Sequence, residues 1–168
     1  MSGSGAPQVE RLDAEGLRVA IVASSWHETV MEGLIAGATA ACTRAGAVSV
    51  LVRVPGTFEL PLAAQTAARA GFDAVVALGV VIRGGTPHFE YVCDAATSGL
   101  TRVALDTGVP IGFGVLTCDD EAQALDRAGL PGSREDKGTE AAEAALSMAL
   151  ALPEIRRPGA VQSTGFGA

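Results

Sequence analysis

The stretch VVIRGGTPHFEYV, residues 80–92, joins an apolar run to an arginine, two glycines, a threonine and a histidine. Backbone N–H groups in a glycine turn before a helix, together with the positive end of that helix, form a ready site for a phosphate group. Gly84, Gly85 and Thr86 fit this description, although they equally suit a plain turn between a strand and a helix. The turn has neither the P-loop pattern nor the G-x-G-x-x-G spacing of dinucleotide-binding folds, which argues against a nucleotide cofactor.

His88 is the candidate for proton transfer, because it follows this turn directly. An imidazole with a pKa of about 6.5 can accept and donate protons at neutral pH. A histidine that only caps a helix or faces solvent is the alternative interpretation. His27, the other histidine, has only serine and tryptophan before it and ranks below His88.

Short apolar runs alternate along the chain with segments of helical periodicity. The runs predict strands at residues 17–23, 48–54, 73–82 and 109–117. The periodic segments predict a helix within residues 26–46 and a second one that follows Pro55 and Gly56 and ends at about residue 70. Further helices are predicted at residues 88–106, 119–128 and 136–152. This alternation predicts an α/β fold, a parallel sheet with helices on both faces, in which the third run is the central strand. The helix after that run is expected to bury Val92, Ala95, Ala96, Leu100 and Val103.

In an open parallel sheet, ligands bind beyond the carboxyl ends of the strands. The first three predicted strands are followed by Trp26, by residues 55–59 and by residues 83–88. Phe113 is expected near the end of the fourth strand, at the same edge. Trp26 either packs in the core or offers a stacking surface to a flat heterocycle. Glu59 would favour the dipole of its helix even without a function.

The composition limits the class of protein. A chain of 168 residues, 48% hydrophobic and 18% charged, suits a single globular domain over residues 1–168, with about 1–8 and 157–168 as flexible ends. The net charge of -7 argues against nucleic-acid or membrane partners, whose anionic groups require clustered lysine and arginine. No apolar run approaches the roughly 20 residues of a membrane span, and the first residues lack a signal-peptide pattern, so a cytoplasmic protein is expected.

Cys42, Cys93 and Cys118 are widely spaced and form no C-x-x-C pair. We interpret them as small buried hydrophobic residues without disulfides. The two histidines and these cysteines do not have the spacing of a metal site, so no metal is expected.

Four segments together resemble the lumazine synthase family, in the family's order and spacing. They are VPGTFELP at residues 54–61, GVVIRGGTPHFEYV at 79–92, PIGFGVLTCDDEAQALDRAG at 110–129 and DKGTEAA at 136–142. The resemblance covers about residues 16–150. It implies a flavodoxin-like, three-layer α/β/α sandwich with a four-stranded parallel sheet, to which the N-terminal segment of a neighbouring subunit can add.

The resemblance implies a transferase of riboflavin biosynthesis that needs no cofactor. The enzyme would condense 5-amino-6-(D-ribitylamino)uracil with 3,4-dihydroxy-2-butanone 4-phosphate to 6,7-dimethyl-8-ribityllumazine, with release of phosphate and water. The alternatives are a non-catalytic lumazine or flavin carrier, a shell-forming scaffold of the same fold, and the related archaeal-type riboflavin synthase. Trp26, His88 and Arg127 speak against a carrier, which needs no phosphate clamp, and the short RGGTPH loop favours the lumazine synthase.

Matched position by position, the resemblance implies a role for each motif residue. Those that would bind the pyrimidine and its ribityl chain are Trp26, Thr57, Phe58, Glu59, Val80, Val81, Ile82 and Phe113, the last from an adjacent subunit. Those that would bind phosphate are Gly85, Thr86, Arg127 and Lys137, while His88 would transfer protons. Without the resemblance, Arg127 is an ordinary solvated helix residue.

The sequence departs from the family pattern in three places. Thr57 stands where alanine is frequent, and Gly85 where a larger residue is common, but both roles mainly use the backbone. The DKG motif replaces the usual NKG, which weakens the assignment of Lys137. The family forms pentamers, pairs of pentamers or hollow shells. Residues 127–138 are slightly longer than in shell-forming members, which favours an isolated homopentamer with active sites at subunit interfaces.

Overall fold

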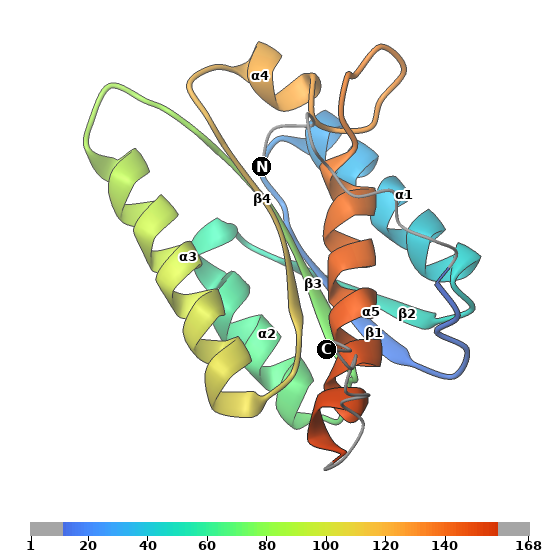
Figure 1. The fold of residues 1–168 in the computed structure, drawn as a ribbon. Coiled ribbons are helices and arrows are strands. Elements are labelled where there is room, and N and C mark those ends of the chain that lie inside the picture. Colours follow the sequence, from blue (N-terminus) through green and yellow to red (C-terminus); the bar gives the residue numbers. More distant parts are fainter. Residues whose placement is uncertain (1–11, 158–168) are drawn as a thin grey trace, which may run out of the picture.

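Four parallel strands lie side by side in the order β2-β1-β3-β4, in a computed structural model that describes residues 12–157 (Figure 1). The strands are β1 (Arg18–Ser24), β2 (Val48–Val54), β3 (Ala74–Ile82) and β4 (Ile111–Cys118). The helices are α1 (Glu28–Arg44), α2 (Leu60–Arg69), α3 (His88–Thr107), α4 (Glu121–Leu125) and α5 (Lys137–Arg156), with a 3-10 turn η1 (Thr57–Glu59) before α2. Because every pairing in this sheet is parallel, the carboxyl ends of the strands meet at one edge.

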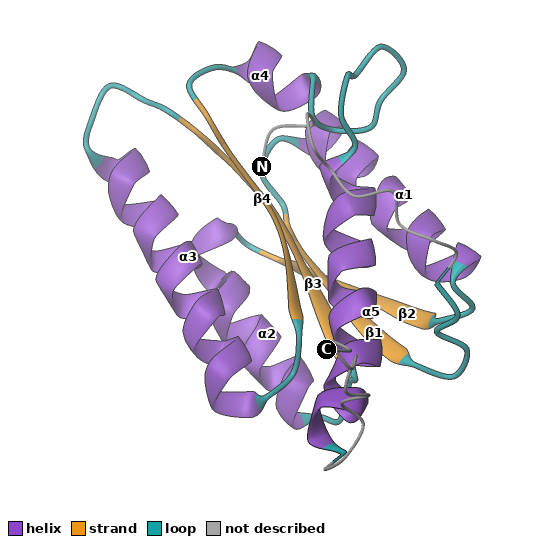
Figure 2. Ribbon diagram, viewed as in Figure 1, coloured by secondary structure: helices purple, strands orange, loops and turns teal. Residues whose placement is uncertain are grey.

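Helices cover both faces of the sheet (Figure 1, Figure 2). The core on one face packs β-sheet residues against α1 and α5, and the core on the other face packs them against α2 and α3. β3 is the central strand, and its first seven residues, 74–80, are buried. The predicted α/β/α sandwich of flavodoxin-like type, with four parallel strands, is therefore confirmed.

The observed elements differ from the predicted ones mainly at their ends. β4 begins two residues late, because Pro110 has no N–H to donate to the strand ladder. α4 ends at Leu125 instead of filling the predicted residues 119–128, because a series of tight backbone turns follows it. α5 continues through Pro153 to Arg156, since the proline removes only one backbone hydrogen bond from the exposed last turn.

Burial along α3 and at the cysteines corrects two expectations. Three of the five α3 residues expected in the core are buried, but Val92 and Ala95 are only partly buried. Val92 borders a cavity at the start of the helix, which explains its exposure. Cys42 and Cys118 are buried as predicted, whereas the prediction is wrong for Cys93, which is half-buried.

The predicted flexible ends fall, apart from Arg157, outside the described residues, and a single domain over residues 1–168 stays a prediction. Within residues 12–157, no helix combines the length and the apolar character needed to cross a bilayer.

Glycines allow α5 to approach its neighbours closely. A β-carbon on Gly138, in the first turn of α5, would overlap the carbonyl oxygen of Leu34 on α1. A β-carbon on Gly112 in β4 would overlap the carbonyl oxygen of Ala141 on α5. α5 therefore lies directly against α1 and β4.

Replacing Gly138 with alanine is expected to lower the free energy of unfolding by about 1–3 kcal/mol, because the new methyl group forces the backbones of α1 and α5 apart. Urea unfolding followed by circular dichroism measures the change. Gly84→Ala is the matched control: its β-carbon would meet no atom within 4 Å. That variant should stay within about 0.5 kcal/mol of the wild type. Equal stability of Gly138→Ala and the wild type would contradict the close approach.

β2 forms one edge of the sheet and exposes apolar side chains there. Val48, Val50, Leu51 and Val52 are each 45% to 60% exposed. β2 pairs with β1 alone among the described strands, so one row of its backbone groups lies open. An open, apolar edge strand promotes association with another chain unless it is covered. This edge is therefore a surface on which a second chain can add.

Candidate active site

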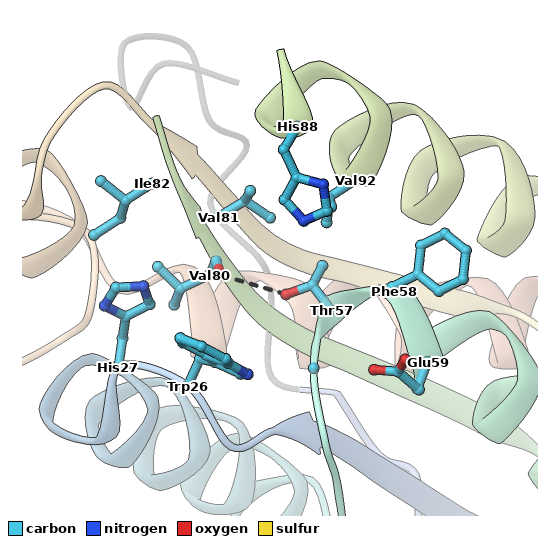
Figure 3. Close-up of a pocket in the computed structure, with 11 residues that line it drawn as sticks. Trp26, His27, Thr57, Phe58, Glu59, Val80, Val81, Ile82, His88 and Val92 are labelled. Atoms are coloured by element: carbon cyan, nitrogen blue, oxygen red, sulfur yellow. Dashed lines mark hydrogen bonds between the residues drawn. The ribbon is translucent and has the colours of Figure 1, made fainter. Parts of the chain in front are cut away.

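A cavity of about 350 Å³ opens at the carboxyl edge of the sheet, where β1 and β3 end and η1 begins (Figure 3). The residues that line it are Trp26, His27, Gly56, Thr57, Phe58, Glu59, Val80, Val81, Ile82, His88 and Val92. Cavities of this size, at this place in a parallel sheet, bind small molecules. Most of the predicted substrate-binding residues and His88 thus lie together around one cavity.

Trp26 and Glu59 both lie close to Gly56. A β-carbon on Gly56 would lie 3.1 Å from Glu59 Oε2 and 3.7 Å from Trp26 Nε1, so the missing side chain keeps this space open. Trp26 is 66% exposed, which excludes the core-packing alternative. The arrangement presents an aromatic face to a flat ring, beside a carboxylate that can accept hydrogen bonds from hydroxyl groups.

The end of β3 is open to this cavity. β1 pairs with β3 only as far as Leu78, whereas β4 pairs with it as far as Ile82. The side of residues 80–82 that faces away from β4 therefore has no paired strand. Thr57 is buried, and its hydroxyl donates a 3.3 Å hydrogen bond to the Val80 carbonyl, which fixes η1 against the strand. The threonine that replaces the frequent alanine thus has a structural role.

His88 and His27 reach the cavity from different elements (Figure 3). His88 is the first residue of α3 and is exposed. His27 precedes α1 with a φ of 59°, in the left-handed region that few residues other than glycine adopt. Strained backbone of this kind is frequent at ligand sites. Sequence reasoning ranked His27 low because its neighbours carry little chemistry. It placed Gly56 at this edge of the sheet without a role, and it expected Val92 in the core.

The glycine turn occupies residues 83–87, between β3 and α3. Gly85 and Thr86 are exposed and are not among the residues that line the first cavity, although the chain leads from them directly to His88. No side chain caps the amino end of α3 within the described residues. The first N–H groups of α3 can therefore donate hydrogen bonds to an anion.

Arg83, at the start of this turn, is bound to carboxylates. Its guanidinium donates to Asp119 Oδ1 at 3.0 Å and also to Glu90. These hydrogen bonds hold the pKa values of Asp119 and Glu90 below the ordinary range and raise the pKa of Arg83. The arginine of the glycine turn is consequently engaged within the protein.

Phe113, Arg127 and Lys137 line a second cavity, of about 260 Å³, along β4. None of them borders the first cavity. Phe113 is the third residue of β4 and pairs with Ala77, so the expectation that it lies near the carboxyl end of the strand is wrong. Arg127 lies beyond α4, partly buried, and donates from Nη1 to the Gln123 carbonyl at 2.8 Å. It is thus neither helical nor fully solvated.

Lys137 begins α5 among carboxylates. Its ammonium group lies 2.5 Å from Glu135 Oε2 and 2.7 Å from Glu140 Oε2. Burial opposes the charged form, but these two hydrogen bonds raise the pKa of Lys137 above its ordinary value. The bond from Lys137 also lowers the pKa of Glu135. Asp136 caps α5 by accepting from Thr139 N at 2.9 Å, a role that asparagine fills equally well, so DKG preserves this helix start.

The predicted residues therefore form two groups on one chain. We call the residues of the first cavity the ring-side group. It offers the aromatic face of Trp26, the carboxylate of Glu59 and the imidazole of His88. We call Phe113, Arg127 and Lys137 of the second cavity the cation group. It offers a guanidinium and an ammonium beside an exposed aromatic ring. The first group suits a flat polar heterocycle and proton transfer, and the second suits an anion. Within residues 12–157, no three histidine, cysteine, aspartate or glutamate side chains gather as they would around a metal ion.

Comparisons with known proteins agree on one family. A sequence model described as 6,7-dimethyl-8-ribityllumazine synthase matches residues 16–152. A protein of that name from Leifsonia xyli subsp. xyli is 68% identical over 157 residues, which cover 93% of this chain and 99% of the relative. Another, from Kineococcus radiotolerans, is 68% identical over 90% of this chain and 94% of its own length. A third, from Streptomyces avermitilis, is 57% identical over 94% of this chain and 99% of its own length.

Proposed function

Because the chain belongs to the 6,7-dimethyl-8-ribityllumazine synthase family, we infer that it condenses 5-amino-6-(D-ribitylamino)uracil with 3,4-dihydroxy-2-butanone 4-phosphate. The products are 6,7-dimethyl-8-ribityllumazine, phosphate and water. The protein is a transferase of riboflavin biosynthesis that acts on small molecules. Identity of 57–68% with synthases over almost the whole chain carries this conclusion. We expect the enzyme to work in the cytoplasm.

The ring-side group is proposed to hold the pyrimidine. Trp26 would stack on the ring, and the open backbone edge of residues 80–82 would bond its polar atoms. Glu59, beside Thr57 and Phe58, would accept hydrogen bonds from the ribityl hydroxyl groups. The support is the exposed indole face, the unpaired edge of β3 and the open space at Gly56.

The cation group and the glycine turn are proposed to hold the butanone phosphate. The pyrimidine amine attacks the ketone and loses water to form an imine, with His88 moving protons. Phosphate then leaves, and its developing charge is met by Arg127, by Lys137 and by the N–H groups at Gly85 and Thr86. Tautomerisation and attack of the second amine close the ring with loss of water. Holding two small substrates together supplies much of the rate.

We propose that each active site forms between two subunits. The enzyme is a homo-oligomer, and the two groups line separate cavities of one chain. A ring-side group from one subunit facing a cation group from its neighbour would complete the site, with Phe113 as a wall. The exposed apolar edge of β2 supports such contact, since a neighbour's N-terminal segment can cover it.

An isolated homopentamer is the assembly we expect, because the segment at residues 127–138 is slightly longer than in shell-forming relatives. A pentamer of 16.9 kDa chains should sediment as a single species of about five chain masses. Analytical ultracentrifugation at several concentrations measures this. A particle in the megadalton range would contradict the isolated pentamer in favour of a shell, and a doubled mass would indicate paired pentamers.

Turnover of the purified protein with the two substrates tests the function itself. Lumazine absorbance and phosphate release should rise together, in equal amounts, without added metal or cofactor. Tight lumazine binding without turnover would make the protein a carrier or scaffold instead. Conversion of lumazine alone to riboflavin would identify the archaeal-type riboflavin synthase.

A further inference from the structure

Arg83 connects both ends of the link between β3 and α3 to β4. Its backbone N donates to the Cys118 carbonyl at 2.9 Å, and its Nε donates to Asp119 Oδ1 at 3.0 Å. Its Nη1 donates to Glu90, and its guanidinium carbon lies 4.2 Å from the centre of the Phe89 ring. Because residue 83 starts the link and residues 89 and 90 follow its end, these contacts close the link into a loop.

The link has few other restraints among the described residues. Residues 84–87 make no side-chain hydrogen bond with any part of residues 12–157, and all four are exposed. A β-carbon on Gly84 or Gly85 would meet no atom within 4 Å. The placement of the link and of His88 at its end therefore depends on the contacts made at its two ends.

We propose that Arg83 is a positioning residue, which braces this link so that His88 and the N–H groups at Gly85 and Thr86 face the butanone phosphate correctly. The inference rests on the proposed function and assigns a role that none of the predicted site residues has. A planar guanidinium can bond two carboxylates along its edge while its flat face stacks on a ring, whereas an ammonium has no flat face to stack.

Direct binding of phosphate by Arg83 is the competing role, and the local charges oppose it. One guanidinium faces the two carboxylates Asp119 and Glu90, so the cluster presents no net positive charge to an anion. Lys137 also lies beside two carboxylates, but it shares its cavity with the guanidinium of Arg127. The guanidinium would also have to leave these partners to reach a substrate. Bracing needs no such rearrangement.

Steady-state kinetics of Arg83→Gln and Arg83→Lys test the role. Arg83→Gln is expected to lower kcat/KM for the butanone phosphate about tenfold, because small displacements of reacting groups are costly, and to change KM for the uracil substrate less than about twofold. Arg83→Lys should fall between Arg83→Gln and the wild type, since lysine keeps the charge but loses the fork. A general loss of structure would instead change the kinetic constants for both substrates to a similar extent.

Glu90→Gln separates bracing from direct contact. Calorimetric titration with inorganic phosphate should show binding weakened about threefold to tenfold if Glu90 helps to brace the link. If Arg83 bound phosphate directly, removal of the competing carboxylate would strengthen that binding. Arg102→Ala is the matched control, because Arg102 lies on the same helix, is exposed and, among residues 12–157, has Asp106 at 3.2 Å as its one ion-pair partner. It should leave every parameter unchanged.

Two results would overturn the inference: wild-type kinetics and phosphate binding in Arg83→Gln, or tighter phosphate binding in Glu90→Gln. Failure of the wild type to turn over both substrates would instead overturn the proposed function. The phosphate titration does not require turnover, so it still decides the role of Arg83 in that case.

Discussion

Replacing Arg127 with alanine is expected to lower kcat/KM for the butanone phosphate by about 100-fold to 1000-fold. A guanidinium forms two charge-assisted hydrogen bonds to a phosphate group, and these strengthen as phosphate leaves with its negative charge. The other groups proposed at this position cannot replace it. Lys137 is engaged by Glu135 and Glu140, and the glycine turn offers neutral N–H groups. Stopped-flow turnover with both substrates measures the loss.

Two variants define the origin of this effect. Arg127→Lys keeps the charge without the fork and should recover only part of the activity. Arg134→Ala removes a neighbouring arginine that is exposed and paired with Asp126, so its kinetics should match the wild type. In all three variants, KM for the uracil substrate should stay close to the wild-type value. Equal kinetics for Arg127→Ala and the wild type would remove the phosphate role.

The sequence predicts the layers and the central strand well because periodicity reports burial. A strand covered on both faces, such as β3, must be apolar at every position, and a helix on a sheet must be apolar at helical spacing. The ends of elements are less certain, because they depend on local hydrogen bonds that periodicity does not report. The proline at residue 110 shortens β4, while the proline at residue 153 does not stop α5.

Much of the first cavity could be predicted because most of its residues follow soon after strand ends. Trp26 and residues 56–59 lie at the edge that the rule for parallel sheets indicates, whereas residues 80–82, inside β3, are implied only by the family resemblance. The cation group could not be located in this way. Phe113 lies within β4 and Arg127 beyond a short helix, so only the fold shows that they share a separate cavity. Nor could composition reveal that Arg83 is already bound to carboxylates.

Co-expression of two weakened variants is expected to restore activity if each site takes one group from each of two subunits. Trp26→Ala disables the ring-side group, and Arg127→Ala disables the cation group. In randomly mixed oligomers, about one interface in four joins an intact ring-side group to an intact cation group. Turnover at low substrate concentration should therefore rise to about a quarter of wild type, well above either separate variant, of which Arg127→Ala is expected at about 1% or less.

The matched control pairs Trp26→Ala with His88→Ala, because both residues belong to the ring-side group of the same cavity. No interface in such mixtures has an intact ring-side group, so turnover should equal the mean of the two separate variants. Differently tagged subunits, purified through both tags in sequence, ensure that only mixed oligomers are assayed. If Trp26→Ala and Arg127→Ala fail to restore each other while the tags show mixing, each site lies within one chain. The two cavities would then have to serve different purposes, and the binding of phosphate by the cation group would need another explanation.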